Sequence, residues 1–248
     1  MRTFQVLGIT LTDYSVREAM RKVEEYLKDG KVSTICYITT GGILEAENHP
    51  ETKSFLENMN LTVAADAEFL KAADILTRGH QREIENSDFM RIFLNRVARD
   101  RLKVCLISDS QDAADKLEQG LKSYQGGLQV IGRFTAIDAE SEETETLIND
   151  INVLAPEIII SNLSYPLREA FFEQHHMKLH AEVWLILNNN MVIESRSLSL
   201  LERMKKGLTR KALARSVDQY RKDQLKSDTK EIDTDAVNKA IEGENPQK

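Results

Sequence analysis

Short runs of apolar, often β-branched residues alternate with longer amphipathic segments over most of this chain, and this alternation most constrains its fold. The predicted strands cover residues 33–39, 61–65, 102–107, 128–131, 158–162 and 183–187. The predicted helices cover residues 15–28, 42–48, 50–57, 69–76, 87–99, 108–123, 142–153 and 166–178. Strands separated by helices in this way form βαβ units, whose strands are parallel. The sequence therefore predicts an α/β fold built on a mostly parallel sheet, with residues 4–10 as an edge strand.

Two of the predicted helices begin with the capping-box pattern, a serine followed three residues later by Glu or Gln. The pairs are Ser15 with Glu18 and Ser108 with Gln111. In this pattern the serine hydroxyl accepts a hydrogen bond from a backbone N–H of the first turn. We therefore expect helices to begin at both places.

Composition narrows the class of protein. The 248 residues are enough for one large domain or two small ones. Hydrophobic residues make up 41% and charged residues 29%, which excludes a fully disordered chain, a collagen and a membrane bundle. The net charge is −7, which argues against non-specific binding of nucleic acid by the whole protein.

The charge is unevenly distributed along the chain. Residues 201–223 hold eight basic and three acidic side chains, a net charge of +5, whereas residues 224–248 carry −2 and residues 1–200 carry −10. We therefore divide the chain into an α/β domain (1–196), a basic amphipathic appendage (197–223) and a polar tail (224–248).

The cysteines and the N-terminus indicate the compartment. Cys36 and Cys105 both lie within apolar runs, and we expect them to be buried free thiols in a reducing compartment, although a disulfide stays open. The N-terminal residues lack the apolar core of a signal peptide, and no stretch reaches the 18 apolar residues of a membrane span. A cytoplasmic protein is expected.

Polar residues follow five of the predicted strands, at the point where each strand ends. They are Thr39, Thr40 and Gly41; Asp66; Ser108 and Asp109; Tyr165 and Arg168; and Asn188 and Asn189. The carboxyl ends of parallel strands lie at one edge of a sheet, where helix N-termini favour anions such as a diphosphate. The sequence predicts a small-molecule site at this edge, although turns are polar in any protein.

Asp66 is the strongest single candidate for a catalytic residue. It ends an apolar strand and has alanines on both sides, so its carboxylate would be partly desolvated, which raises its pKa and improves it as a general base. The alternative role is that of an N-cap for the following helix, which needs only a carboxylate oxygen.

Motifs for other chemistries are missing from the sequence. It has no P-loop, no G-x-G-x-x-G and no G-x-S-x-G. His176 and His180 have the i,i+4 spacing of two metal ligands, but no H-E-x-x-H glutamate lies between them and no cysteine lies nearby. We predict neither a metal nor an organic cofactor.

The basic segment has an apolar side. Apolar residues recur three to five positions apart at Leu201, Met204, Leu208, Ala212, Val217 and Tyr220, with Lys205, Lys206, Arg210, Lys211 and Arg215 between them. A helix of this kind can dock on an anionic membrane surface. It can equally pack on the acidic body of the protein, and the two roles do not exclude each other.

The order of these landmarks resembles the WecG/TagA/CpsF family of bacterial glycosyltransferases between about residues 33 and 187. The likeness rests on Ile38-Thr39-Thr40-Gly41-Gly42, Asp66-Ala67, Asn86-Ser87-Asp88-Phe89, Leu106-Ile107-Ser108-Asp109, Val130-Ile131-Gly132, Pro156-Glu157-Ile158-Ile159 and Ser164-Tyr165-Pro166-Leu167-Arg168-Glu169. It implies a Rossmann-like fold with helices on both faces of the sheet.

The resemblance also implies a function. That function is metal-independent, inverting transfer of an N-acetylmannosamine-type sugar from a UDP donor to a lipid-linked acceptor at the inner membrane face, in cell-surface polysaccharide synthesis. Asp66 matches the proposed base, Thr39 matches a pocket threonine, and the basic appendage matches one that meets the membrane and lends arginines to the site. Substrate would be bound by Thr40, Gly41, Ser108, Asp109, Tyr165, Arg168, Asn188 and Asn189.

Several donor-site positions depart from the family pattern. Gly41 replaces an asparagine, Ser108 and Asp109 replace paired glycines, Arg168 replaces a glutamine and Glu83 replaces an arginine, with Arg82 adjacent. Side chains, and a negative charge at Asp109, disfavour the approach of a diphosphate. Three functions therefore stay open. The first is an active glycosyltransferase, and the second is a non-catalytic relative that binds a nucleotide sugar or pairs with an active glycosyltransferase or a second copy. The third is a regulator unrelated to sugars.

Overall fold

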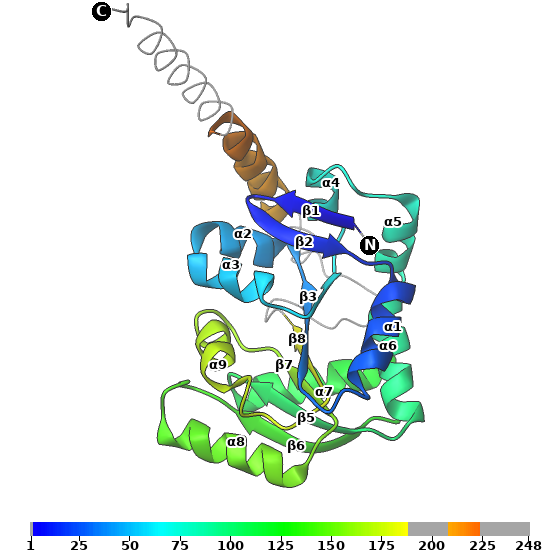
Figure 1. The fold of residues 1–248 in the computed structure, drawn as a ribbon, viewed down its shortest axis with the longest axis vertical. Helices are drawn as coiled ribbons and strands as arrows, with labels where there is room; N and C mark the ends of the chain where they lie inside the picture. The colour runs from blue at the N-terminus through cyan, green and yellow to red at the C-terminus, as the bar shows by residue number, and fades with distance from the viewer. Residues whose placement is uncertain (1, 188–207, 224–248) are drawn as a thin grey trace, which may run out of the picture.

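The structure, a computed structural model, describes residues 2–187 and 208–223. Its centre is a six-stranded sheet in the order β4-β3-β8-β7-β5-β6, and every pairing in it is parallel. The strands are β3 (Ser33–Ile38), β4 (Leu61–Ala64), β5 (Lys103–Ser108), β6 (Gln129–Thr135), β7 (Ile158–Ser161) and β8 (Val183–Leu187). The predicted α/β architecture with a parallel sheet is confirmed (Figure 1).

Helices connect the strands and cover both faces of the sheet (Figure 1). They are α1 (Val16–Tyr26), α2 (Thr40–Asn48), α3 (Pro50–Glu57), α4 (Glu68–Ala72), α5 (Arg78–Glu85), α6 (Asp88–Arg99), α7 (Gln111–Tyr124), α8 (Glu142–Leu154) and α9 (Leu167–His175). A further C-terminal helix spans residues 208–223.

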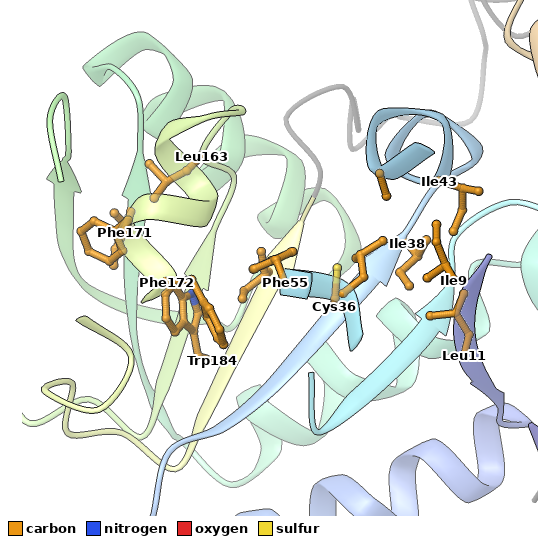
Figure 2. Packing of buried hydrophobic residues seen from close by; sticks show 14 of the residues in the cluster. Ile9, Leu11, Cys36, Ile38, Ile43, Phe55, Leu163, Phe171, Phe172 and Trp184 are labelled. Carbon is orange, nitrogen blue, oxygen red and sulfur yellow. The ribbon is translucent and has the colours of Figure 1, made fainter. Parts of the chain in front are cut away.

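Two hydrophobic cores form because the central strands are apolar on both faces, as parallel sheets require. In β3, Ile35 and Tyr37 pack with α1, α6 and α7, whereas Cys36 and Ile38 pack with α2, α3, α8 and α9. Figure 2 shows the second core, in which the rings of Phe172 and Trp184 have centroids 5.9 Å apart. This packing fixes the strand ends that carry the candidate site.

Both cysteines are free and buried, as predicted. Cys36 lies in β3 and Cys105 in β5. Burial raises the pKa of the Cys36 thiol to about 12 and that of Cys105 to about 11.

The first capping box is confirmed and the second is wrong. Ser15 accepts a hydrogen bond from the Glu18 N–H at 3.3 Å, and the Glu18 carboxylate accepts one from the Ser15 N–H at 3.0 Å. Ser108, however, is the buried last residue of β5. Helix α7 is capped instead by Ser110, whose hydroxyl accepts from the Ala113 N–H at 3.2 Å. The error arises because β5 continues to the residue expected to start the cap.

The N-terminal edge strand is also wrong. The chain instead forms an antiparallel hairpin of β1 (Arg2–Val6) and β2 (Ile9–Asp13), a separate two-stranded sheet. Leu7 and Gly8 connect the two strands with φ values of +50° and +73°, the signs that a tight hairpin turn requires at both positions. The two halves of the apolar run therefore pair with each other and not with the main sheet.

The C-terminal helix packs on the body of the protein through one face. Leu213, at 3% exposure, is buried in the same core as the hairpin, and Val217 and Tyr220 pack against that core. Leu208, at 66% exposure, and Ala212 face solvent instead, so the predicted apolar stripe is wrong at these two positions. Leu201, Met204, Lys205 and Lys206 lie outside the described residues.

Two ion pairs join this helix to the segment around α4. Arg210 Nε lies 3.2 Å from Glu68 Oε2, and Arg221 Nη2 lies 3.2 Å from Asp74 Oδ2. The packing on the acidic body that the sequence left open is therefore observed. No helix among residues 2–187 and 208–223 is both long and apolar enough to cross a bilayer.

Candidate functional site

The carboxyl ends of the strands bring most of the predicted site residues to one edge of the sheet. Thr39 follows β3, Asp66 lies two residues after β4, Ser108 ends β5, and Tyr165 follows β7. In the sheet, β8 lies between β3 and β7, so the end of β8 is at the centre of this edge. Asn188 and Asn189, which follow β8, lie outside the described residues.

Asp66 is held by the first residue of α2. The Thr40 N–H donates to Asp66 Oδ2 at 2.7 Å, and the Thr40 hydroxyl donates to Asp66 Oδ1. The neighbouring Thr39 caps α2, its hydroxyl accepting from the Gly42 N–H at 3.2 Å. Gly41 lies between Thr40 and Gly42 in the first turn of α2. The ends of β3 and β4 are thereby joined into one rigid unit.

The environment of Asp66 separates the two roles considered for it. Its carboxylate accepts a hydrogen bond from the Glu68 N–H at 3.3 Å, but the N-cap residue of α4 is Ala67, so the alternative role of Asp66 as the N-cap is wrong. Burial raises the pKa of Asp66 above its ordinary value, while the bonds from Thr40 and Glu68 act in the opposite direction. A partly desolvated carboxylate with a raised pKa is the predicted condition for a general base.

Arg168 is buried rather than presented as a free cation. It is 5% exposed, its Nη2 lies 2.7 Å from Glu45 Oε2, and it also pairs with Glu169. Glu169 in turn accepts a hydrogen bond from the Thr52 hydroxyl at 2.9 Å. The guanidinium lies over the ring of Phe55, 5.1 Å from its centroid. Two carboxylates therefore more than balance the single charge of Arg168.

A narrow cavity brings Arg168 together with Thr39. It lies between the carboxyl ends of β3 and β8 and helices α2, α3 and α9, and its lining includes Thr39, Gly42, Thr52, Arg168 and Leu187. Within the described residues, Arg168 donates through Nε and Nη2, and no hydrogen bond from Nη1 is found there.

Ser108 and Asp109 connect two loops at the other end of this edge. The Ser108 hydroxyl donates to Asn162 Oδ1 at 2.5 Å. Asp109 accepts from the Ser164 N–H at 3.0 Å and from the Ser164 hydroxyl at 2.6 Å. These bonds tie the end of β5 to the loop after β7, so the two side chains are engaged within the protein.

Tyr165 links the start of α9 to the start of α3. Its hydroxyl donates to Glu51 Oε1 at 2.5 Å, and its ring lies 4.2 Å from that of His49, measured between centroids. The bond to Glu51 raises the pKa of Tyr165 to about 12.

A second hollow lies off the β4 edge, between the hairpin, β4 and α5. His80 Nε2 lies 3.3 Å from Asp13 Oδ1 at its margin, and Glu83 accepts from the Val16 N–H at 3.2 Å. Glu83 faces this hollow, whereas Arg82 is exposed. The neighbouring arginine therefore does not replace the one that the family pattern has at Glu83.

The histidine cluster bonds to the backbone. His175 Nε2 lies 2.7 Å from the Ala139 carbonyl, and His176 Nδ1 lies 2.8 Å from the Phe172 carbonyl. Within the described residues, no three His, Cys, Asp or Glu side chains are grouped so that they could hold a metal ion.

Sequence reasoning missed the partners that hold these side chains. Glu45, Thr52 and Glu169 lie within helices, and a search limited to residues that directly follow strands does not reach them. Of the predicted residues, Thr39, Thr40 and Asp66 form one group, with Arg168 lining a cavity beside Thr39, and Ser108 and Asp109 form a second group with the loop after β7. Tyr165 contacts the start of α3 instead.

Comparison with known families agrees with the motifs. A family model described as the glycosyl transferase WecG/TagA/CpsF family matches residues 4–191. The match takes in the hairpin from Phe4 onward, the whole parallel sheet and every predicted site residue from Thr39 to Asn189. No match was found among curated proteins. The chain belongs to the WecG/TagA/CpsF family of glycosyltransferases.

Proposed function

We propose that this protein transfers an N-acetylmannosamine-type sugar from a UDP donor to a lipid-linked acceptor, with Asp66 as the general base. Membership of the family supports sugar transfer in general. The observation that carries the proposal is the position of Asp66, a partly buried carboxylate whose pKa burial raises, next to the Thr39 cap at the carboxyl edge of the sheet. Cell-surface polysaccharide synthesis is the process that this chemistry would serve.

The reaction is a single displacement with inversion. An Asp66 oxygen takes the proton of the acceptor hydroxyl while that hydroxyl oxygen forms a bond to the anomeric carbon of the donor. The bond between the anomeric carbon and the phosphate oxygen breaks, and UDP leaves with both electrons of that bond. A positioned general base contributes about 10²–10⁴-fold to such a step.

Arg168 acts on the donor through directed hydrogen bonds. Its single positive charge is paired with the two negative charges of Glu45 and Glu169, so the cluster is net negative and gives no long-range attraction for a diphosphate. Arg168 lines the cavity beside Thr39, where its remaining N–H donors would bond an oxygen of the sugar or of the leaving group. Arginines of the appendage other than Arg210, which pairs with Glu68, would supply the remaining positive charge.

The donor side differs from the rest of the site. The engaged side chains of Ser108 and Asp109 occupy the place of glycines in the family pattern, and Asp109 adds a negative charge there. Slow transfer from ordinary UDP-N-acetylmannosamine follows. This same observation favours a second candidate function, a non-catalytic relative that binds a nucleotide sugar or pairs with an active glycosyltransferase or a second copy.

The C-terminal helix would hold the protein at the inner face of the cytoplasmic membrane. Lys211, Arg215 and Lys222 are exposed, and their spacing places them on one side of the helix, opposite the packed face of Leu213 and Val217. A row of cations of this kind favours an anionic surface.

Calorimetric titration of the purified protein with UDP and UDP-sugars tests the proposal. We expect saturable binding that strengthens in Asp109→Asn, because this variant removes a negative charge near the diphosphate. Asp115→Asn, on α7, removes the same charge from the surface and is the matched control. Absence of binding to all of these nucleotides would overturn sugar transfer and nucleotide-sugar binding, and would leave pairing with an active glycosyltransferase or a second copy as the function.

A further inference from the structure

We infer that Thr40 is a positioning residue, which fixes the orientation of the Asp66 carboxylate and holds it in its charged form. The inference rests on the proposed function of Asp66 as a base. Thr40 follows the pocket threonine Thr39 and is only 3% exposed, so it is not offered to substrate as Thr39 is.

The geometry is a two-point attachment. The N–H of Thr40 bonds one carboxylate oxygen of Asp66, at 2.7 Å, and its hydroxyl bonds the other. Two bonds from one residue to the two oxygens fix the plane of the carboxylate relative to the first turn of α2. The start of a helix also carries partial positive charge, which favours an anion there. Only the hydroxyl bond depends on the side chain of Thr40.

The charged groups around Asp66 show why this hydroxyl matters. Burial raises the pKa of Asp66, and the negative charge of Glu68 on α4 adds to the rise. Arg210 of the C-terminal helix pairs with Glu68 rather than with Asp66. On β3, Tyr37 is buried and its own pKa is raised, in part by the charge of Asp66. Among the influences that lower the pKa of Asp66, the hydroxyl bond from Thr40 is the largest.

A base must be both charged and aimed at the proton that it takes. Loss of the Thr40 hydroxyl removes a bond to the charged carboxylate, which favours the protonated form. The same loss lets the carboxylate turn about its remaining bonds. Thr40→Val should therefore move the acid limb of kcat/KM to higher pH and lower kcat/KM about tenfold below neutral pH.

The test measures the pKa of Asp66 directly, by ¹³C NMR of its carboxyl group. Thr40→Val should raise this pKa, and Thr40→Ser, which keeps a hydroxyl, should restore it towards the wild-type value. Thr52→Val is the matched control, because Thr52 is equally buried and donates its hydroxyl to a different carboxylate, that of Glu169. In the wild-type protein the Thr40 amide signal should titrate together with the Asp66 carboxyl, a readout that needs no variant.

The outcomes separate this inference from the proposed function. An Asp66 pKa unchanged in Thr40→Val, or raised as much by Thr52→Val, would overturn the inference. So would a Thr40 amide that is insensitive to the titration of Asp66, even if the valine variant does not fold. The expected pKa changes in a protein without any transferase activity would support the role of Thr40 and count against the proposed function instead.

Discussion

Arg168 Nη2 lies 2.7 Å from Glu45 Oε2, and this contact joins the first turn of α9 to α2. The same guanidinium pairs with Glu169, whose side chain is 6% exposed. The arginine that replaces a glutamine of the family pattern is thus a buried charge within an ion-paired cluster. Its first consequence is for stability.

Arg168→Met should lower the free energy of unfolding by about 3–5 kcal/mol, because it leaves the buried Glu169 carboxylate without a cation. Arg133→Met is the control, since Arg133 also pairs with two carboxylates, those of Asp115 and Glu118, but is 47% exposed. Arg133→Met should lower the free energy of unfolding by less than about 1 kcal/mol. Urea unfolding of both measures the difference, and equal losses would mean that the Arg168 cluster is not desolvated as described.

Two leucines of the C-terminal helix test its packing. Leu213→Ala should cost about 2–5 kcal/mol, because Leu213 is buried in the core, whereas Leu208→Ala should stay within about 0.5 kcal/mol. Denaturant unfolding followed by circular dichroism compares the two. Small and similar effects would show that the helix does not fold as one unit with the body.

The outward face of that helix should bind membranes. Flotation with anionic vesicles should fall as salt rises, and should fall further in the triple variant Lys211→Gln, Arg215→Gln, Lys222→Gln, at about 1 kcal/mol per cation. The triple variant Lys28→Gln, Lys31→Gln, Lys116→Gln removes the same charge from exposed positions elsewhere. Equal flotation with neutral and anionic vesicles, or an equal loss in the control, would contradict membrane docking by this helix.

The raised pKa of Asp66 predicts the sign of a pH effect on stability. The folded state holds the Asp66 proton more tightly than the unfolded state does. The stabilisation is therefore fully present below the unfolded pKa of about 3.9 and is lost as pH rises through the folded pKa. Over this window, Asp66→Asn should gain stability relative to wild type as pH rises. Asp150→Asn, at an exposed position of α8, should not follow this trend, and a constant difference for Asp66→Asn would contradict the raised pKa.

The central strands β3, β7 and β8 were predictable because they are buried throughout and consist mostly of apolar residues. Residues 183–187 match β8 at both ends, and 50–57 match α3, which Pro50 begins. The hairpin was missed because one apolar stretch contains the turn at Gly8. Helix α5 was missed because it is polar and has no buried residue.

Part of the candidate site was likewise predictable from the sequence and part was not. Asp66 and Thr39 were found because residues at strand ends must meet at one edge of a parallel sheet. The pairing of Arg168 with Glu45 was not predicted, because the two residues lie 123 positions apart in the sequence and in different helices. The packed face of the C-terminal helix was misassigned because Ala212 and Leu213 are adjacent, and spacing alone does not decide between them.

Transfer of labelled N-acetylmannosamine from UDP to a lipid-linked acceptor in anionic vesicles tests the central claim most directly. The role of Asp66 as base predicts slow transfer by the wild-type protein and a further loss of about 10²–10⁴-fold in Asp66→Asn, with Asp150→Asn unaffected. Rapid turnover that is unchanged in Asp66→Asn would contradict both the assigned base and the altered donor site.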